Sequence, residues 1–594
     1  MPRIRLPRFP KRIGGLVEDL RRKEDRLSLV LSLFIGALVG LVVVAFILLT
    51  GRLAAHMYPA GGLGWRRILV PTLGSLLTGY LLYRYFPLAR GSGIPQTRAA
   101  LFIHDGRISL RSAIGKFICC STSLASGIPL GREGPSVYIG SGLASVISRR
   151  LGLTKAQVKS LVPIGGAAAL SAAFNTPIAA VLFTLEEIMG DLHAPVLGSV
   201  VLASATAWMV LHLVLGDSPL FHVPGYHLVN PAELAIYALL GVIGGFASVA
   251  FVKLLLKLRE RFLRMPNSTL WLQPVAGGLT AGILGFFVPQ VLGVGYDQVE
   301  RVLNGDVILK TVVLLAVLKI IATAVAYSSG NAGGIFGPSL FIGAMVGGSV
   351  GGVAHTLFPG YTAGPGAYAL VGMGALFAGI IRTPLTSVIM VFELTRDYTI
   401  IVPLMISNLI AFFISQKFQR EPIYEALAHQ DGLHLPIGPF RTATALWVTS
   451  AIRTPPEPLT LEMKVDEARD MIDSSDLESW PVVDEDGLVG MVRISDIIDA
   501  TTGSQRPVTI ATIMKRARGP NAANNDLIPH VHSDHPLGLA LARMGDTGHN
   551  VLPVVRRDNS RVMIGLVTLT DVLQAYGVDP RRVTPAGGVG VFKE

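Results

Sequence analysis

Long apolar segments, separated by short polar ones, fill the chain from residue 27 to about residue 430. Eight of these segments are long enough to cross about 30 Å of hydrocarbon as single helices. They comprise residues 27–50, 67–86, 108–128, 194–215, 231–256, 268–288, 309–328 and 399–418. The pattern predicts a polytopic membrane domain that is mainly α-helical.

Shorter apolar segments between them are interrupted by Gly and Pro. They comprise residues 91–103, 132–149, 155–173, 176–189, 336–357, 365–378 and 382–395. Interrupted segments at membrane depth are tolerated only where protein buries them or where they line a cavity. In transporters, such broken helices direct their ends at the ligand, so they indicate where a site lies.

The pattern changes after residue 430. Residues 431–445 contain Gly, Pro and His and predict a linker. Two similar units follow, and each one reads as helix, β-branched strand, turn, strand and helix. We predict that residues 446–503 and 504–580 form two cytoplasmic α/β domains, followed by a tail at 581–594.

Composition supports this division of the chain. Residues 431–594 hold 37 of the 91 charged residues, a density usual for soluble domains, whereas residues 27–430 hold 41. The chain as a whole is 51% hydrophobic and 15% charged, with a mean hydropathy of +0.53. This balance excludes an ordinary cytosolic enzyme.

The basic charge has a topological explanation. Residues 1–26 hold nine Lys or Arg against four acids, within a net charge of +11. The positive-inside rule places this segment in the cytoplasm, and the soluble C-terminal domains are expected on the same side. We therefore expect the lipid bilayer, and not nucleic acid, as the partner of the basic chain. Cys119 and Cys120 are adjacent in an apolar segment, which predicts no disulfide framework.

Three Gly/Pro motifs carry the candidate chemistry. They are GSGIP at 91–95, GREGP at 131–135 and GGIFGP at 333–338. Gly permits an unusual turn and Pro suits a first helical turn, so each motif predicts a loop that ends in a helix N-terminus. Free N–H groups and the positive dipole end favour an anion there. The second and third motifs open similar Gly-rich helices about 200 residues apart, which indicates an internal repeat.

With these motifs, in this order, the chain resembles the CLC family of voltage-gated chloride channels and chloride/proton antiporters over residues 27–430. The resemblance implies a homodimer in a prokaryotic inner membrane, with two inverted halves and one anion pathway in each subunit. It also implies an anion site with hydroxyl donors at Ser92 and Tyr424 and amides at Ile335 and Phe336. The whole set of anion-binding candidates is Ser92, Gly93, Ile94, Gly134, Ile335, Phe336 and Tyr424.

Two carboxylates are candidates for gating and proton transfer. Glu133 matches the family's gating glutamate, and a carboxylate at a helix N-terminus imitates a bound anion until a proton removes its charge. Glu187 matches the internal proton-transfer position of the antiporters, whereas Glu186 is expected to be a structural or cytoplasm-facing neighbour. The sequence therefore favours chloride/proton antiport, with a passive, voltage- or pH-gated chloride channel as the alternative.

Other readings of the membrane domain are weaker. Ser126 repeats the SGIP string, but motif order favours Ser92. Ser349 lies in a GxSxG string that is expected mid-helix rather than at a nucleophile elbow. The chain contains no HExxH and no Walker A motif. We expect neither an enzyme nor a metal site. Arg132 is expected to pack, and Lys116 either raises the potential along the pathway or snorkels to an interface.

The two C-terminal units resemble a tandem pair of CBS domains. In that family, Thr568 and Asp571 match a position that contacts the ribose and phosphate of an adenosine nucleotide such as ATP, ADP or AMP. Arg493 stands where the first unit would have Ser or Thr, which disfavours a second equivalent site. A structural role in stabilising a dimer fits the sequence equally well. Transport itself requires no cofactor, with chloride and protons as the substrates.

Overall fold

The computed structural model describes residues 24–58, 63–192, 196–217, 219–226, 228–397, 399–433, 446–472, 477–502, 509–518, 529–557 and 559–576. The basic N-terminal segment up to residue 23, most of the predicted linker and the C-terminal tail lie outside these residues. The chain divides into two compact units, residues 1–441 and 442–594, which are described separately.

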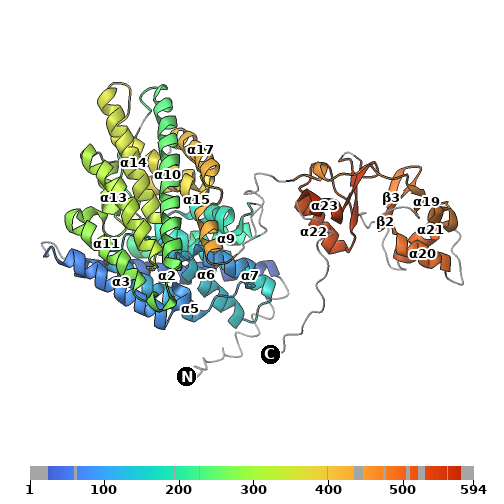
Figure 1. The fold of residues 1–594 in the computed structure, drawn as a ribbon, viewed down its shortest axis with the longest axis horizontal. Coiled ribbons are helices and arrows are strands. Elements are labelled where there is room, and N and C mark those ends of the chain that lie inside the picture. Colours follow the sequence, from blue (N-terminus) through green and yellow to red (C-terminus); the bar gives the residue numbers. More distant parts are fainter. Residues whose placement is uncertain are drawn as a thin grey trace, which may run out of the picture. The chain divides into compact units, whose positions relative to one another are not determined.

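The first unit is built from helices (Figure 1). Its α-helices are α2 (Glu24–Met57), α3 (Arg66–Arg84), α4 (Ile94–Phe102), α5 (Leu110–Ala125), α6 (Glu133–Arg150), α7 (Lys155–Phe174), α8 (Pro177–Phe183), α9 (Leu197–Leu215), α10 (Glu233–Leu263), α11 (Gln273–Phe287), α12 (Tyr296–Leu303), α13 (Leu309–Ser328), α14 (Phe336–Leu357), α15 (Pro365–Ile381), α16 (Pro384–Thr395), α17 (Ile401–Phe418) and α18 (Ile423–Gln430). A π-helical segment, η2 (Thr184–Met189), follows α8, and 3₁₀ turns lie at Pro87–Ala89, Asn267–Thr269 and Pro289–Val291.

Within the described residues, six helices are long and apolar enough to cross a membrane: Leu27–Met57, Leu197–Leu215, Glu233–Leu263, Leu309–Ser328, Phe336–Leu357 and Ile401–Gln430. Two of the eight predicted spans are shorter than the sequence suggested, because α5 has 16 residues and α11 has 15. Conversely, α14 runs without a break for 22 residues, since its many Gly residues serve helix contacts. The sequence pattern overestimated the lengths of α5 and α11. It gave the bounds of α14 correctly and was wrong only in grouping this segment with the interrupted ones.

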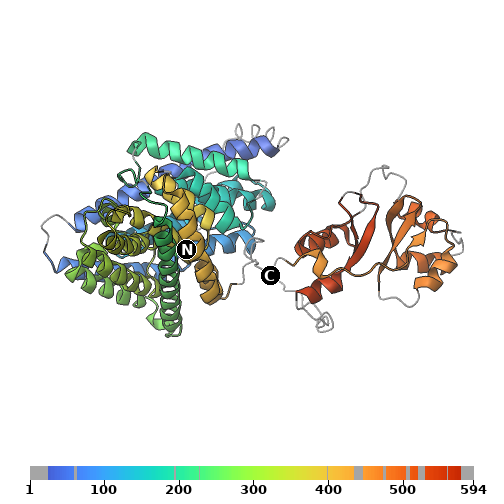
Figure 2. The ribbon, with the colours of Figure 1, turned by 90° about the horizontal axis from the view of Figure 1, so that it is seen from above.

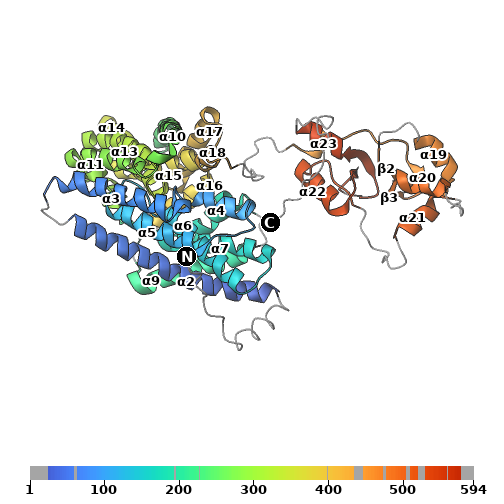
Figure 3. The same ribbon diagram turned by 60° about the horizontal axis from the view of Figure 1, so that its bottom comes forward.

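The helices of this unit form two sets in the same order, α2–α9 and α10–α17. Helix α2 packs on α9 as α10 packs on α17, and α6 packs on α7 as α14 packs on α15. Figure 3 shows α2 beside α9, with α13 and α14 together in the other half. The predicted internal repeat is therefore present, and the fold is that of two helical repeats with broken helices.

Close helix packing in each half depends on glycine. A Cβ on Gly140 would lie 2.3 Å from the carbonyl oxygen of Gly165, and a Cβ on Gly343 would lie 2.5 Å from that of Gly372. Neither distance leaves room for a side chain. The Gly-rich runs that carry the GxSxG string are thus contact surfaces, as small residues commonly are in membrane helices.

The second unit contains two small sheets (Figure 2). One has the order β1-β2-β3 and the other pairs β4 with β5. Its elements are β1 (Leu459–Thr460), α19 (Val465–Ile472), β2 (Ser479–Asp484), β3 (Gly487–Arg493), α20 (Ile494–Thr502), α21 (Ile510–Arg518), α22 (Leu537–Thr547), β4 (Val551–Val555), β5 (Met563–Thr568) and α23 (Leu569–Ala575), with a 3₁₀ turn at Val448–Ser450. β1 and β2 are parallel, whereas β2–β3 and β4–β5 are antiparallel.

The hydrophobic cores of this unit each include residues from both sides of the predicted boundary at residue 503. Ile510 and Ile513 of α21 pack into the first core. Val448, at the start of the unit, packs into the second core instead. Each core therefore includes residues from the other side of the predicted boundary. The hydrophobic pattern along the sequence does not reveal such an exchange.

Candidate intramembrane anion site and nucleotide site

All three Gly/Pro motifs begin helices, and these helix N-termini lie together. The loops before α6 and α14 are joined by two hydrogen bonds of 2.7 Å between Gly131 and Gly334. The turn before α4 contacts α6, because a Cβ on Gly93 would lie only 2.7 Å from the carbonyl oxygen of Gly134. Gly93 also has a φ of +105°, which side chains rarely adopt. Three positive dipole ends are thereby concentrated in one buried place.

The carboxylate of Glu133 lies within this cluster. Its side chain is fully buried, although Glu133 is itself the first residue of α6. Oε2 accepts a hydrogen bond of 3.2 Å from the backbone N–H of Gly337, in the first turn of α14. Oε1 accepts a hydrogen bond from the hydroxyl of Tyr296. The carboxylate thus lies at a helix N-terminus of the opposite half, where an anion would be stabilised.

Two buried hydroxyls lie close to the same region. Ser92 and Tyr424 are fully buried, and within the described part of the chain neither hydroxyl has a hydrogen-bond partner. Tyr424 lies in α18, which packs against α4, the helix that begins two residues after Ser92. An unsatisfied buried hydroxyl costs about 1–3 kcal/mol. This pair is therefore suited to an anion that accepts hydrogen bonds.

The remaining anion-binding candidates divide into backbone donors and turn residues. Ile335 is the N-cap of α14 and Phe336 its first residue, so their amides belong to the open end of the helix. Ile94 begins α4 in the same way. The N–H of Gly93, in contrast, is already donated to Oε1 of Gln96 at 2.9 Å. Gly93 shapes the turn, and its amide is not open to an anion.

The ring of Phe336 belongs to an aromatic cluster. Its centroid lies 4.7 Å from that of Phe174, 5.5 Å from that of Phe183 and 4.4 Å from that of Phe377. Phe183 immediately precedes the π-helical segment that carries Glu187. Packed rings therefore join the first residue of α14 to the residue that precedes the segment with Glu187.

Glu187 forms a buried ion pair that the sequence did not predict. Nη1 of Arg98 lies 3.1 Å from Oε1 of Glu187, and both side chains are at most 3% exposed. Arg98 belongs to α4, which begins two residues after Ser92. One short helix therefore connects the hydroxyl site with the buried acid.

Glu186 has a structural contact, as the sequence suggested. Its carboxylate accepts hydrogen bonds from the N–H (3.0 Å) and hydroxyl (2.8 Å) of Thr386, in the first turn of α16. Glu393 of α16 reciprocates, accepting from the N–H groups of Ile178 (2.9 Å) and Ala179 (2.7 Å) at the start of α8. Each half thus caps a broken helix of the other half.

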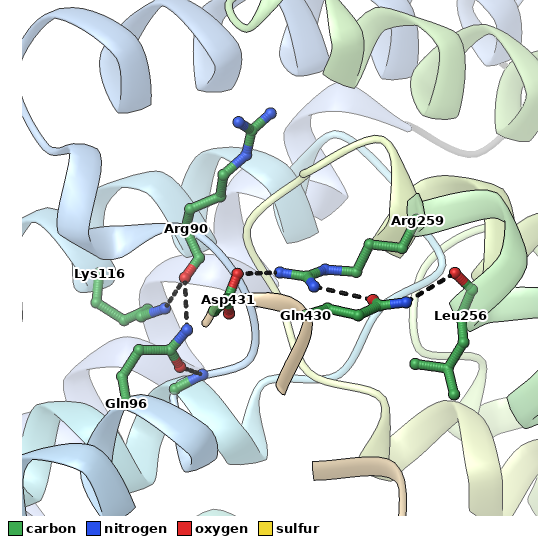
Figure 4. Close-up of polar contacts among 8 residues, drawn as sticks. Arg90, Gln96, Lys116, Leu256, Arg259, Gln430 and Asp431 are labelled. Atoms are coloured by element: carbon green, nitrogen blue, oxygen red, sulfur yellow. Dashed lines mark hydrogen bonds and ion pairs between the residues drawn. The ribbon is translucent and has the colours of Figure 1, made fainter. Parts of the chain in front are cut away.

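Lys116 holds the loop that leads to Ser92. The side chain is fully buried, and Nζ donates to the carbonyl oxygen of Arg90 at 3.2 Å (Figure 4). Nζ also donates to the carbonyl oxygen of Gly91 at 2.9 Å. Gln96 joins the same network through the carbonyl oxygen of Arg90. The suggestion that Lys116 snorkels to an interface is wrong, because its ammonium group fixes a buried loop.

A cavity of about 320 Å³ adjoins this loop and is lined in part by residues at the C-terminal end of α18. Figure 4 shows Arg259 of α10 reaching Gln430 and Asp431, and the hydrogen bond to Gln430 measures 3.0 Å. Asp431, the first residue of the predicted linker, pairs with Arg259 of the membrane unit. The helix whose first turn carries Tyr424 is therefore anchored at its far end.

Three residues that were expected to have structural roles make structural contacts. Ser126 is the C-cap of α5, where its hydroxyl donates to the carbonyl oxygen of Ser123, so its string begins no helix. Ser349 lies within α14 and donates to the carbonyl oxygen of Met345 four residues earlier. The guanidinium of Arg132 packs 5.6 Å from the ring centroid of Tyr296.

Tyr296 and Lys319 were missed, although the repeat signals them. Tyr296 stands 203 positions after Gly93, and Lys319 stands 203 positions after Lys116, the same offset that separates Glu133 from Phe336. Nζ of Lys319 donates to the carbonyl oxygens of Val291 (3.0 Å) and Gly293 (2.7 Å), in the loop before α12. The repeat offset, applied to the first motif, would have located this fourth helix start.

In the second unit, Thr568 and Asp571 form a capping box at the start of α23. The Thr568 hydroxyl donates to Asp571 at 2.6 Å and accepts from the Asp571 N–H at 3.1 Å. Asp571 also pairs with Arg453, Nε to Oδ1 at 2.6 Å. In the first CBS unit, Arg493 stands at the position of Thr568 and pairs with Asp496 at 3.4 Å. The structure thus gives both nucleotide candidates a structural contact.

Broken helices whose N-termini meet around a buried carboxylate define an integral membrane protein with a site inside the membrane domain. The model of the voltage gated chloride channel family matches residues 73–416, more than half of the chain, and the CBS-domain model matches residues 448–503 and 525–577. The chain belongs to the voltage-gated chloride channel family and carries a tandem CBS pair.

Individual relatives agree with this assignment. An H(+)/Cl(-) exchange transporter ClcA of Vibrio campbellii is 30% identical over 421 residues, 68% of this chain and 89% of that one. A chloride channel protein described as ClcB-like, from Ralstonia nicotianae, is 34% identical over 381 residues, 63% of this chain and 88% of that one.

Solved structures share the fold. A slow cyanobacterial Cl⁻/H⁺ antiporter superimposes with a TM-score of 0.63 at 27% identity, covering 68% of this chain and 97% of the other. A eukaryotic CLC transporter has a TM-score of 0.61 at 21% identity and covers 94% of this chain and 98% of its own, which shows the likeness in fold alone.

Proposed function

We propose that the protein exchanges chloride for protons across a prokaryotic inner membrane, with Glu133 as the gate. The observation that carries this proposal is the buried carboxylate of Glu133 at the N-terminus of α14, bonded to the N–H of Gly337. A carboxylate and a chloride compete for the same helix end, and protonation removes the competitor. The names of the exchange transporter and antiporter relatives support this assignment.

Chloride is held in this scheme mainly by dipoles and hydroxyls. The donors are the amides at the start of α14, Ile335 and Phe336, with the amides of Gly134 and Ile94 and the hydroxyls of Ser92 and Tyr424. Such groups bind an anion without trapping it as a fixed cation would.

Glu187 is the internal proton carrier in this proposal. Its burial supports the role, because an ionisable group at membrane depth is costly and usually functional. Its ion-pair partner Arg98 belongs to α4, which packs against α18, the helix that carries Tyr424. Glu186, which caps α16, is assigned the structural role.

A passive chloride channel is the second candidate, and one observation favours it. The carboxylate of Glu187 is engaged in a buried ion pair with Arg98, which is consistent with a structural role that fixes α4 in place. A carrier that does not take up protons would leave chloride uncoupled.

The experiment that decides is a coupling measurement. The purified protein is reconstituted into liposomes, and a chloride gradient is imposed without a proton gradient. The exchange proposal expects protons to be driven uphill as chloride moves, and Glu133→Gln is expected to abolish proton movement while some anion flux remains. Chloride flux without proton movement in the unmodified protein would establish the channel instead.

We also propose the assembly and topology that the family resemblance implies, namely a homodimer with both termini in the cytoplasm. The divisions at 1–26, 27–430, 431–445 and the CBS pair belong to this proposal. The mass of the detergent-solubilised protein and protease access to the C-terminal unit in sealed vesicles test it. A monomeric mass would contradict the homodimer. Cleavage from the outer side only would contradict the cytoplasmic position of the C-terminus.

The CBS pair is proposed as an adenosine-nucleotide site around Thr568 and Asp571. Binding would have to replace or extend the capping box and the contact with Arg453. Calorimetry of the full-length protein with ATP, ADP and AMP, with Thr568→Ala as the comparison, tests this. Absence of heat with all three nucleotides leaves the structural role.

A further inference from the structure

Tyr296 reaches the gating carboxylate from the second half of the membrane unit. It is the first residue of α12, and its hydroxyl donates a hydrogen bond to Oε1 of Glu133. The N–H of Gly337 takes the other oxygen. Both oxygens of the carboxylate are therefore held, one by a helix N-terminus and one by a phenol.

The position of the phenol is fixed by its surroundings. Gly295, with a φ of +84°, turns the chain into α12. Lys319 ties down the carbonyl oxygens of the preceding loop. The ring packs edge-on against Phe221 at 5.7 Å, and the Arg132 guanidinium lies against it. A donor held in this way loses little entropy when it bonds to the carboxylate.

We propose that Tyr296 is a latch on Glu133 that stabilises the charged carboxylate at the anion position. The proposal rests on the gating role of Glu133. A hydrogen bond to an ionised acceptor is roughly twice as strong as a neutral one, so the latch favours the carboxylate over the protonated acid. Chloride must displace a carboxylate held at both oxygens, and Tyr296 therefore weakens chloride binding and makes it more dependent on protons.

Other charged or titratable groups face Glu133, and a conservative substitution leaves them in place. Arg132 precedes it on its own helix, Tyr424 faces it from α18, and Lys319 of α13 lies behind the loop that carries Tyr296. Gly337 and Pro338 of α14 have no ionisable side chain. Tyr296→Phe keeps the ring contacts and removes only the hydroxyl.

The test is chloride titration of the full-length protein by calorimetry at alkaline and acidic pH. At alkaline pH, Tyr296→Phe is expected to bind chloride roughly tenfold more tightly, because a hydrogen bond to a charged group contributes about 1.5 kcal/mol or more. At acidic pH, where Glu133 is protonated, the variant and the unmodified protein should converge. Equal affinities at alkaline pH would overturn the latch.

Two further variants isolate the cause. Tyr226→Phe removes a phenol that donates to the carbonyl oxygen of Leu303, at the other end of α12, and should leave chloride affinity unchanged. In a Glu133→Ala background, Tyr296→Phe should have no further effect, whereas tighter binding that persists there contradicts the latch. If Glu133→Ala itself changes neither chloride affinity nor its pH dependence, the gating role fails as well. If it changes both while Tyr296→Phe changes nothing, only the latch fails.

Discussion

The two halves of the membrane unit share a scaffold but not a chemistry. Each half has a buried lysine that holds a loop, Lys116 in the first and Lys319 in the second. Each opens a Gly-rich helix beside the paired glycines at 131 and 334. Yet the position of Glu133 in the first half is filled by Phe336 in the second. Counted from the first residues of α8 and α16, the position of Glu187 is filled by Leu394, and both replacements are buried and apolar.

The difference indicates how one repeat can serve two tasks. The second half supplies a helix N-terminus and a phenol to the site, which are suited to holding negative charge. The first half supplies carboxylates that gain or lose protons. Anion binding is thus carried by features common to both halves, and proton handling is confined to one.

The largest expected effect comes from removing Glu187, one of the two carboxylates that have no acidic counterpart in the second half. Glu187→Gln is expected to abolish proton coupling, because an amide of the same shape cannot carry a proton through the buried region. Chloride flux should persist, since the helix ends and hydroxyls remain. Proton movement driven by a chloride gradient in liposomes measures this.

The control for Glu187→Gln lies in the second half. Glu393→Gln alters a half-buried helix-capping carboxylate in the equivalent helix and should leave coupling intact. Coupling that survives in Glu187→Gln, or is lost equally in both variants, would contradict the asymmetry between the halves.

The helix starts that form the anion site could be predicted from the sequence, because Gly and Pro mark helix starts through local backbone rules. The motifs located the N-termini of α4, α6 and α14. The order of the motifs favoured Ser92 over Ser126. The partners of the acids could not be predicted in the same way. Arg98 and Tyr296 meet Glu187 and Glu133 through tertiary contacts between segments 89 and 163 residues apart.

The second prediction concerns Arg98, whose counterpart by position, Arg301, is exposed. Removing one member of a buried ion pair costs about 3–5 kcal/mol, so Arg98→Gln should strongly lower thermal stability in detergent. Arg301→Gln should change it little. The double variant Arg98→Gln/Glu187→Gln should recover much of the loss, and a double variant as unstable as Arg98→Gln would show that the pair is not the cause.

Replacing Lys116 or Lys319 is expected to lower stability by a smaller amount. The two replacements are expected to change chloride binding in opposite directions. Replacing either lysine with Met leaves buried carbonyl oxygens unsatisfied, at a cost of about 1–3 kcal/mol. Lys116→Met loosens the loop before Ser92 and should weaken chloride binding. Lys319→Met loosens the loop before Tyr296 and should tighten chloride binding at alkaline pH, as Tyr296→Phe does. Calorimetric titration of both variants checks the signs, and changes in the same direction would contradict separate roles for the loops.

The smallest expected effect concerns the reciprocal caps, where the halves are most alike. Glu186→Gln and Glu393→Gln each keep a side-chain oxygen but remove the charge that faces a helix N-terminus, an interaction of about 0.3–1 kcal/mol. Both variants should therefore lose a little thermal stability, by similar amounts, with coupling unchanged. Thermal denaturation in detergent and the liposome assay measure the two outcomes. Loss of coupling in Glu186→Gln alone would extend the proton pathway to the neighbour of Glu187 and make the first half still less like the second.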